Sequence, residues 1–244
     1  MSLLNNKENL LENFGLSACL AIREMVLPGP KQIKTTKDNS VFVVTCDEQG
    51  GKKVNILSKK TDLFSYLNLL QELYENSEFF LCERNLRLDN YIPCKKVNYG
   101  FYYRFKSEKY KIDSFVSTVI SEKEYSQKLK DIFMEQKKIN CDLNLERWLV
   151  NENKTICVAK GNELAGFIVL SRYHEQFFIN AIYVCELYRH LGIGTELLMY
   201  ASNYVNENGG NYFYGMSPYK MKDFYNKLNV DSFEGWILWR KKNA

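Results

Sequence analysis

The sequence predicts an α/β protein of the α+β type, in which a mixed, mostly antiparallel sheet is flanked by helices. Three apolar segments of strand length, at 154–159, 164–171 and 177–184, follow one another with short turns between them. Such close spacing favours an antiparallel meander, because parallel strands need a long crossover. After the third segment, apolar residues recur with a helical period over 197–205, and the glycines at 209–210 are expected to end that helix.

The rest of the C-terminal half continues this mixture of strands and helices. Before the meander we expect a strand at 115–120 and helices at 122–137 and 145–150. After the long helix we expect a strand at 211–216, a helix that begins at Ser217 and Pro218, and a closing strand at 233–239. The predicted order is therefore β-α-α-β-β-β-α-β-α-β.

The first hundred residues predict a separate α+β unit that contains no recognisable motif. The expected elements are short helices within 9–26, a β-hairpin at 41–45 and 53–57, a helix after Thr61 and Asp62, and strands at 79–82 and 98–105. A charged segment at 106–109 follows them. We therefore predict an accessory domain over 1–106 and a second domain over 107–244. The accessory domain is either a degenerate copy of the C-terminal fold or an unrelated fold.

Composition argues against several functional classes. The net charge of +4 is spread over mixed segments, so nothing favours nucleic-acid binding. The seven cysteines are odd in number and never form Cys-x-x-Cys, and the two histidines do not fall at ligand spacing, so we expect reduced thiols and no metal site. The start lacks a signal-peptide pattern, and no stretch reaches about 20 apolar residues. We expect a cytoplasmic protein without a membrane partner, and the sequence predicts no oligomeric state.

The most informative segment is the turn after the third strand of the meander, which reads Arg-His-Leu-Gly-Ile-Gly over 189–194. Glycines let the backbone approach a ligand, and the first amides of a helix have no partner within it. Because the helix dipole adds about half a positive charge there, the turn suits a phosphate or pyrophosphate. A tight turn without a ligand is an equal alternative from the turn alone. A Rossmann fingerprint would need glycine where Leu197 stands, and the P-loop sequence is absent.

The residues around this turn resemble a known family. The pattern from Val184 through Tyr188 and Arg189 to Gly194 resembles the acyl-CoA-binding motif Arg/Gln-x-x-Gly-x-Gly/Ala of the GNAT N-acetyltransferase superfamily. Downstream, Asp-Phe-Tyr-Asn-Lys-Leu at 223–228 is similar to the second signature of that family, Phe-Tyr-x-Lys-Leu-Gly-Phe. Both motifs occur in the order and spacing of the family. The resemblance covers about the last 130 residues, implies a GNAT-type sheet there, and does not extend to the first hundred.

The resemblance implies that acetyl-CoA is the co-substrate and lies between the strand that ends at Val184 and the strand at 211–216. It implies that the backbone of Ile182, Tyr183 and Val184 pairs with the pantetheine arm, as an added strand would. The amides from His190 to Thr195 would hold the pyrophosphate. The implied cofactor-binding residues of the turn are Arg189, His190, Leu191, Gly192, Ile193, Gly194 and Thr195.

Two residues are candidates for the chemistry. By resemblance, Tyr225 assists departure of the CoA thiolate. An alkyl amine with a pKa of about 10.4 is neutral in only about one molecule in two thousand at pH 7, so a base or desolvation must supply the free amine. The family often uses a glutamate on the strand before the turn, but 177–182 contains no acid. Glu186 is either a substitute base or a solvated loop residue, and a base acting through water is equally open.

These residues predict an acyl-CoA-dependent N-acetyltransferase that transfers an acetyl group directly from acetyl-CoA to a primary amine. The acceptor is open among an amino sugar, an amino acid, a polyamine, a peptide amine and a protein lysine. The alternative is a catalytically silent, CoA-binding GNAT domain that acts as a sensor or interaction module. The missing strand acid favours this alternative, whereas Phe224 and Tyr225 oppose it.

Overall fold

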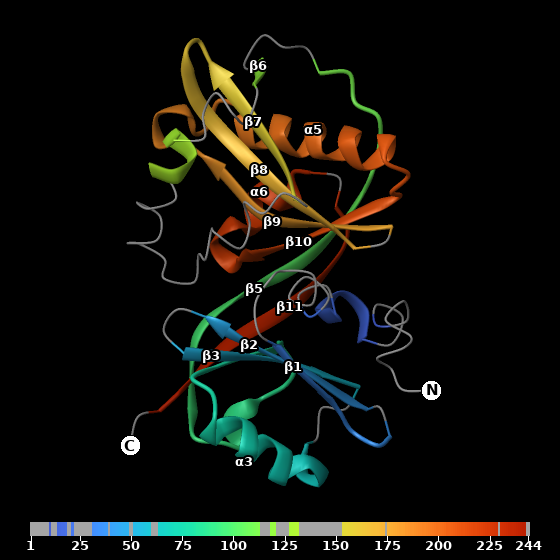
Figure 1. The fold of residues 1–244 in the computed structure, drawn as a ribbon, viewed down its shortest axis with the longest axis vertical. Helices are drawn as coiled ribbons and strands as arrows, with labels where there is room; N and C mark the ends of the chain where they lie inside the picture. Colours follow the sequence, from blue (N-terminus) through green and yellow to red (C-terminus); the bar gives the residue numbers. More distant parts are fainter. Residues whose placement is uncertain are drawn as a thin grey trace. The chain divides into compact units, whose positions relative to one another are not determined.

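The computed structural model describes residues 10, 14–18, 21, 31–38, 40–48, 51–59, 63–112, 118–120, 127–131, 153–173, 175–228 and 230–242. The chain forms two compact units (Figure 1). The first unit combines 1–103 with 216–244, and the second consists of 104–215. The second sequence motif, at 223–228, therefore belongs to the first unit. The division of the chain into an accessory domain over 1–106 and a catalytic domain over 107–244 stays a prediction, since compactness does not define functional domains.

The first unit is built on a sheet with the strand order β1-β2-β3-β4-β11, and the first part of β5 lies beside β11. Its strands are β1 (Lys31–Thr35), β2 (Val41–Glu48), β3 (Gly51–Ser58), β4 (Phe79–Glu83), β5 (Cys94–Lys106) and β11 (Val230–Lys241). Its helical segments are η3 (Gly15–Ser17), η4 (Phe64–Tyr66), α3 (Leu67–Glu75), η5 (Leu88–Asn90), η9 (Tyr219–Met221) and α6 (Lys222–Asn226). β3 and β4 run parallel, whereas β2 pairs antiparallel with β1 and β3, and β4 with β11.

The hairpin predicted at 41–45 and 53–57 is confirmed, with β2 and β3 paired from Val41 and Ser58 to Glu48 and Gly51. The parallel strand β4 then needs a crossover, and η4 and α3 supply it. The predicted strands at 79–82 and 98–105 are confirmed as β4 and the larger part of β5.

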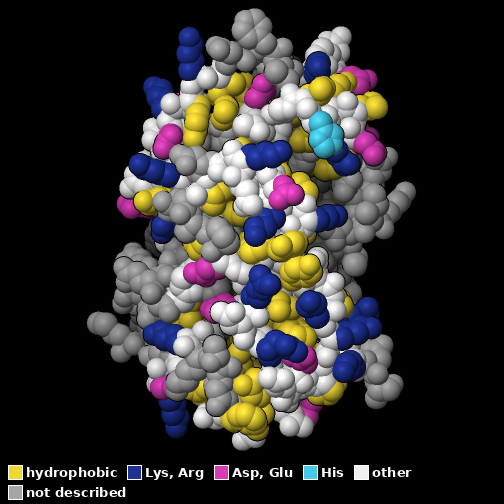
Figure 2. Space-filling view, turned by 180° about the vertical axis from the view of Figure 1, so that it is seen from behind, with side chains coloured by type: hydrophobic (Ala, Val, Ile, Leu, Met, Phe, Trp, Pro, Cys, Tyr) yellow, Lys and Arg dark blue, Asp and Glu magenta, His cyan; other side chains and the backbone are white. Residues whose placement is uncertain are grey.

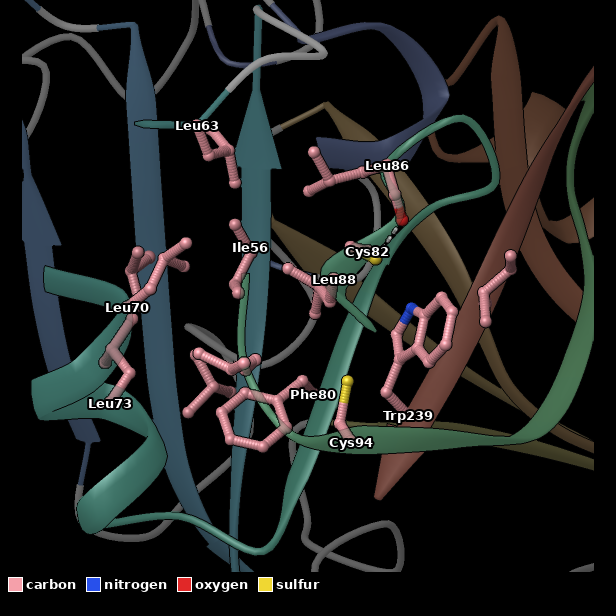
Figure 3. Packing of buried hydrophobic residues seen from close by; sticks show 14 of the residues in the cluster. Ile56, Leu63, Leu70, Leu73, Phe80, Cys82, Leu86, Leu88, Cys94 and Trp239 are labelled. Carbon is pink, nitrogen blue, oxygen red and sulfur yellow. Dashed lines mark hydrogen bonds between the residues drawn. The ribbon is translucent and has the colours of Figure 1, made fainter. Parts of the chain in front are cut away.

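The core of the first unit joins residues from distant parts of the sequence (Figure 3). Leu70 and Leu73 of α3 pack in the same cluster as Phe80 of β4. Trp239 of β11, close to the end of the chain, and Cys94 at the start of β5 belong to this cluster and are 3% and 2% exposed. The last strand is therefore an integral part of the first unit.

The second unit contains the predicted meander. Its strands are the end of β5, β6 (Thr118–Ile120), β7 (Lys154–Lys160), β8 (Glu163–Tyr173), β9 (Gln176–Val184) and β10 (Tyr212–Pro218), whose last residues pass into the first unit. The strands lie in the order β10-β9-β8-β7-β6, and β6 to β9 pair antiparallel in sequence. This arrangement confirms the three strands predicted at 154–159, 164–171 and 177–184, together with the mostly antiparallel sheet.

The long helix α5 (Ile193–Glu207) packs on β7, β8 and β9 (Figure 1). Its buried residues follow the predicted period and are Ile193, Leu197, Leu198, Ala201, Ser202 and Val205. The helix ends as expected, since Gly209 has a φ of +79° and the amide of Gly210 donates to the Val205 carbonyl at 2.9 Å. A short helix (Glu186–Tyr188), labelled η8, precedes α5.

The predicted helix start at Ser217 and Pro218 is wrong, because β10 continues through Pro218 and the helical turn begins at Tyr219. The reason is a tertiary contact within the first unit. Gly100 of β5 lies so close that a Cβ there would be 1.9 Å from the Ser217 carbonyl oxygen. Of the helix predicted at 122–137, residues 127–131 are helical, and the remainder lies outside the described residues, as does the helix predicted at 145–150.

Charged side chains of both signs are distributed over the surface, as the face in Figure 2 illustrates. In the first unit, a pocket of about 390 Å³ is lined by Lys95, Arg240, Lys241 and Lys242. Within the described part of the chain, no helix is both long enough and apolar enough to cross a bilayer, and no three His, Cys, Asp or Glu side chains gather as metal ligands would.

Candidate active site

The glycine turn connects the end of β9 to the start of α5. The Gly192 φ of +85° is a left-handed conformation that other residues adopt only with strain, and His190, at +64°, shares this region. A Cβ added to Gly192 would meet no atom within 4 Å. The backbone conformation therefore requires the glycine, and the space beside it is open to a ligand.

Several backbone amides of this turn are free to bind an anion. The amides of Thr195 and Glu196 both donate to the Gly192 carbonyl, at 2.9 and 3.0 Å. The five amides before them, from His190 to Gly194, make no hydrogen bond within the described residues. Five donors at the positive end of a 15-residue helix fit a diphosphate. Thr195, expected to contribute its amide to this site, already uses that amide inside the helix.

The charged side chains beside the turn are exposed. The Arg189 guanidinium donates from Nε to the Val184 carbonyl at 3.3 Å, and its Nη1 lies 3.9 Å from Oε1 of Glu186. The Glu186 side chain is 88% exposed, so water solvates the carboxylate and this ion pair contributes little. The Tyr188 hydroxyl donates to Oε2 of Glu163 at 3.0 Å, which raises the pKa of Tyr188.

A pocket of about 250 Å³ lies next to this turn. It is lined by Lys128, Asp131, Glu163, Leu164, Cys185, Leu187 and Tyr188. Sequence reasoning did not group these residues, although Lys128 and Asp131 stand three apart on a predicted helix. The Cys185 thiol donates to the Leu164 carbonyl at 3.2 Å, and burial raises its pKa, so the thiolate that a nucleophile needs is disfavoured.

The two strands that would flank the pantetheine arm separate early. β9 pairs with the parallel strand β10 only at Phe177 with Phe213 and at Phe178 with Tyr214. Beyond this point, β9 stays paired with β8 up to Val184, which is opposite Gly166. Among the described strands, β9 therefore shares no residue pair with β10 beyond Phe178. A strand edge without a neighbouring strand presents backbone donors and acceptors to an extended ligand.

Tyr225 lies in the first unit, on α6, and is 5% exposed. Its ring stacks on Tyr103 with a centroid distance of 4.4 Å, and Phe224 meets it edge-on at 4.9 Å. Burial is the main cause that raises the pKa of Tyr225 to about 12, against a smaller lowering by a hydrogen bond with Ser217. The phenol is therefore protonated throughout the neutral range. The structure thus gathers the predicted residues from Ile182 to Thr195 in one strand, turn and helix, and holds Tyr225 in the other unit.

Comparisons with known proteins agree with this architecture. Residues 121–229 match the model of the acetyltransferase (GNAT) family. A GCN5-related N-acetyltransferase from Kribbella flavida is 8% identical, with 94% of this chain and 95% of that chain covered and a TM-score of 0.65. A putative GNAT acetyltransferase from Novosphingobium aromaticivorans is 10% identical, with 95% and 97% covered and a TM-score of 0.57.

A tandem GNAT protein from the clavulanic acid biosynthesis pathway is 9% identical, with 94% and 89% covered and a TM-score of 0.55. No curated protein matches the sequence. The chain therefore carries a GNAT acetyltransferase domain over residues 121–229. The similarity to solved structures extends the GNAT-type fold over nearly the whole chain.

Proposed function

We propose that this protein is an acyl-CoA-dependent N-acetyltransferase that transfers an acetyl group from acetyl-CoA directly to a primary amine. The observation that carries the proposal is the end of the β9–β10 pairing at Phe178, after which β9 leads straight into a turn whose five amides, from His190 to Gly194, make no hydrogen bond within the described residues. CoA has the same order of parts, since an extended pantetheine arm with amide groups is followed by a pyrophosphate. Strand edge and turn together match both parts of the ligand.

In this proposal, the backbone of Ile182, Tyr183 and Val184 hydrogen-bonds the pantetheine amides. The amides of the turn hold the pyrophosphate, and each charge-assisted hydrogen bond contributes about 1.5 to 3 kcal/mol. The exposed Arg189 guanidinium adds a positive charge beside them. Binding is therefore carried by main-chain groups whose positions the fold fixes.

In the transfer step, the amine nitrogen attacks the thioester carbonyl carbon, the C–N bond forms, and the C–S bond breaks as the thiolate leaves. We assign Tyr225 to the leaving thiolate by its place in the second family signature. A phenol with a pKa of about 12 is a much weaker acid than a thiol with a pKa of about 8.5, so complete proton transfer would be uphill by about 5 kcal/mol. Tyr225 would therefore stabilise the thiolate as a hydrogen-bond donor.

Glu186 is our candidate for the base that takes the proton of the amine. Its exposed carboxylate favours a role through an intervening water molecule. The second candidate function, a CoA-binding module without catalysis, is favoured by one observation. The segment of β9 from Ile179 to Val184 contributes no carboxylate to the proposed acyl site.

The test is acetyl-CoA turnover with a panel of amino sugars, amino acids, polyamines and lysine peptides, together with calorimetric CoA binding. We expect binding, and turnover with at least one amine class. Gly194→Asp should weaken CoA binding about 100-fold or more, because its charge opposes the phosphates. An acid near a helix N-terminus favours the helix, so this variant should stay folded.

Gly161→Asp is the matched control. Gly161 lies in the β7–β8 turn and resembles Gly192 of the glycine turn, since its φ is +63° and a Cβ at either residue would meet no atom within 4 Å, but no helix follows Gly161. We expect this variant to bind CoA as the wild type does. Unchanged CoA affinity in a folded Gly194→Asp protein would disprove the site. Binding without turnover of any amine would favour the silent module.

A further inference from the structure

The strand β9 contains a bulge where it leaves β10. In the register with β8, Leu170 is opposite Ile179 and Val169 is opposite Ala181, so Asn180 is an extra residue on β9. A bulge bends a strand and changes the direction of a side chain. Asn180 comes two residues after Phe178, the last residue of β9 that pairs with β10. The bulge therefore lies just beyond the last residue pair of β9 with β10.

The Asn180 side chain is buried, but one of its two polar groups has no partner among the described residues. Asn180 is 6% exposed, and its Oδ1 accepts a hydrogen bond from the Ser171 hydroxyl at 3.2 Å. Its Nδ2 is fully buried and has no hydrogen-bond partner in the part of the chain that the structure describes. Buried amides are nearly always satisfied on both atoms, because an unpaired one destabilises the fold. Nδ2 of Asn180 is therefore a candidate donor for a ligand.

Neighbouring contacts show which face of the sheet Asn180 occupies. Ser171 is opposite Phe178 in the register, and Phe178 stacks on Tyr214 at 5.6 Å. The preceding residue, Phe177, points to the other face, where it meets Tyr204 of α5 edge-on at 6.2 Å. Asn180 therefore shares the face of Ser171 and Phe178, away from α5.

We propose that Nδ2 of Asn180 donates a hydrogen bond to the carbonyl oxygen of the bound acyl group, and that Ser171 is a positioning residue that fixes the amide. This inference rests on the proposed transferase function. As the amine nitrogen bonds to the carbonyl carbon, the electron pair of the C=O double bond moves to the oxygen. The hydrogen bond from Asn180 stabilises that negative charge until the C–S bond breaks and the charge leaves on sulfur.

Three variants test the proposal by the kcat for transfer and by calorimetric affinity for acetyl-CoA and for CoA. Asn180→Ala should lower kcat by about 10² to 10³. It should also lower the affinity for acetyl-CoA, whereas the affinity for CoA, which lacks the thioester carbonyl oxygen, should stay unchanged. Asn180→Asp keeps the shape but loses the donor, so kcat should fall at least as far. Ser171→Ala should have a smaller effect, about tenfold.

Asn55→Ala is the matched control. Asn55 is another buried asparagine, 2% exposed, on β3 of the first unit, and its Nδ2 donates to the Val44 carbonyl at 3.4 Å. This variant should lose thermal stability but keep kcat within twofold. Circular dichroism checks the fold of every variant. If Asn180→Ala does not fold, the isosteric Asp variant carries the test.

An Asn180→Asp protein with wild-type kcat would overturn the proposal, since the side-chain oxygen of residue 180, and not Nδ2, would then be the functional atom. An equal loss of affinity for CoA and acetyl-CoA would overturn it as well, because it would indicate a purely structural role. Failure of the transferase function can be distinguished from failure of the Asn180 proposal, because it appears in the wild type, as absent CoA binding or absent turnover. If the wild type binds without turnover, the ratio of the two affinities still tests the hydrogen bond.

Discussion

The two units contain the same local succession of a hairpin, a helix and a parallel strand. Only in the second unit do the two parallel strands separate after a short pairing. In the first unit, β2 and β3 form the hairpin, α3 crosses over, and β4 returns parallel to β3. In the second unit, β8, β9, α5 and β10 do the same. β3 and β4 pair through four residue positions, from Lys53 with Phe79 to Ile56 with Cys82, whereas β9 and β10 pair through two.

The difference lies in the segment between the hairpin and the helix of each unit. In the first unit, Leu63 is fully buried ahead of η4 and its amide donates to the Tyr91 hydroxyl at 3.1 Å, so core contacts occupy the helix entrance. In the second unit the entrance is an exposed turn with Gly192 at its end. The second unit therefore combines a shorter strand pairing with an exposed helix start. The likeness supports a degenerate copy, rather than an unrelated fold, as the origin of the first unit.

The largest effect is expected from removing residues 1–106. The fragment 107–244 keeps β11 but loses β4 and β5, the two neighbours of β11 in the sheet. Trp239 pairs with Phe80 and is buried in the core of the first unit, so the fragment would expose a large apolar surface. We expect no cooperative unfolding transition and aggregation during purification.

Coexpression of 1–106 as a separate chain is the control for that fragment, and it should restore soluble protein if the missing partners are the cause. A fragment 107–244 that unfolds cooperatively and binds CoA like the full chain would show that the second half is independent of the first unit.

The next largest effect is expected from Tyr225→Phe, a substitution that tests whether the first unit contributes to the chemistry. Removing the hydroxyl should lower kcat by about 10² to 10⁴ and leave CoA affinity within a fewfold. Tyr103→Phe is the matched control, because it removes a hydroxyl from the ring that stacks on Tyr225 and keeps the stack. Single-turnover rates separate chemistry from product release. Wild-type chemistry in Tyr225→Phe would make this tyrosine structural.

A smaller effect is expected from alkaline pH, and the largest pKa shifts behind it lie in the first unit. Burial raises the pKa of Cys94, Tyr103 and Tyr225 to about 12 each, and raises that of Cys82 as well. A folded pKa above the unfolded value means that stability is constant below the unfolded pKa and falls as pH rises towards the folded one. We expect the free energy of unfolding to be flat up to about pH 8 and to fall between about pH 9 and 12.

For Cys94 alone, the loss between pH 8 and 10.5 should be on the order of 1 kcal/mol after allowance for solvent screening. Urea unfolding at the two pH values measures it. Cys94→Ala should make the pH dependence shallower, and an identical slope in that variant would exclude Cys94 as a contributor.

The sequence by itself determined the parts of this protein that depend on neighbouring residues. The hairpin of β2 and β3, the meander of β7 to β9, the period of α5 and its end at Gly209 are local patterns, and each was predicted in place. The turn from Arg189 to Gly194 could be predicted for the same reason. Its φ angles and free amides arise within six residues and one helix start.

Tertiary structure alone decided the features that depend on distant segments. β10 stays extended through Pro218 because Gly100 lies against it, and β11 joins the first unit because its partner β4 comes from a much earlier part of the chain. The separation of β9 from β10 and the bulge at Asn180 are register properties of three strands. The sequence of β9 therefore does not mark Asn180, since its burial, and an Nδ2 without a partner among the described residues, exist only once the strands have paired.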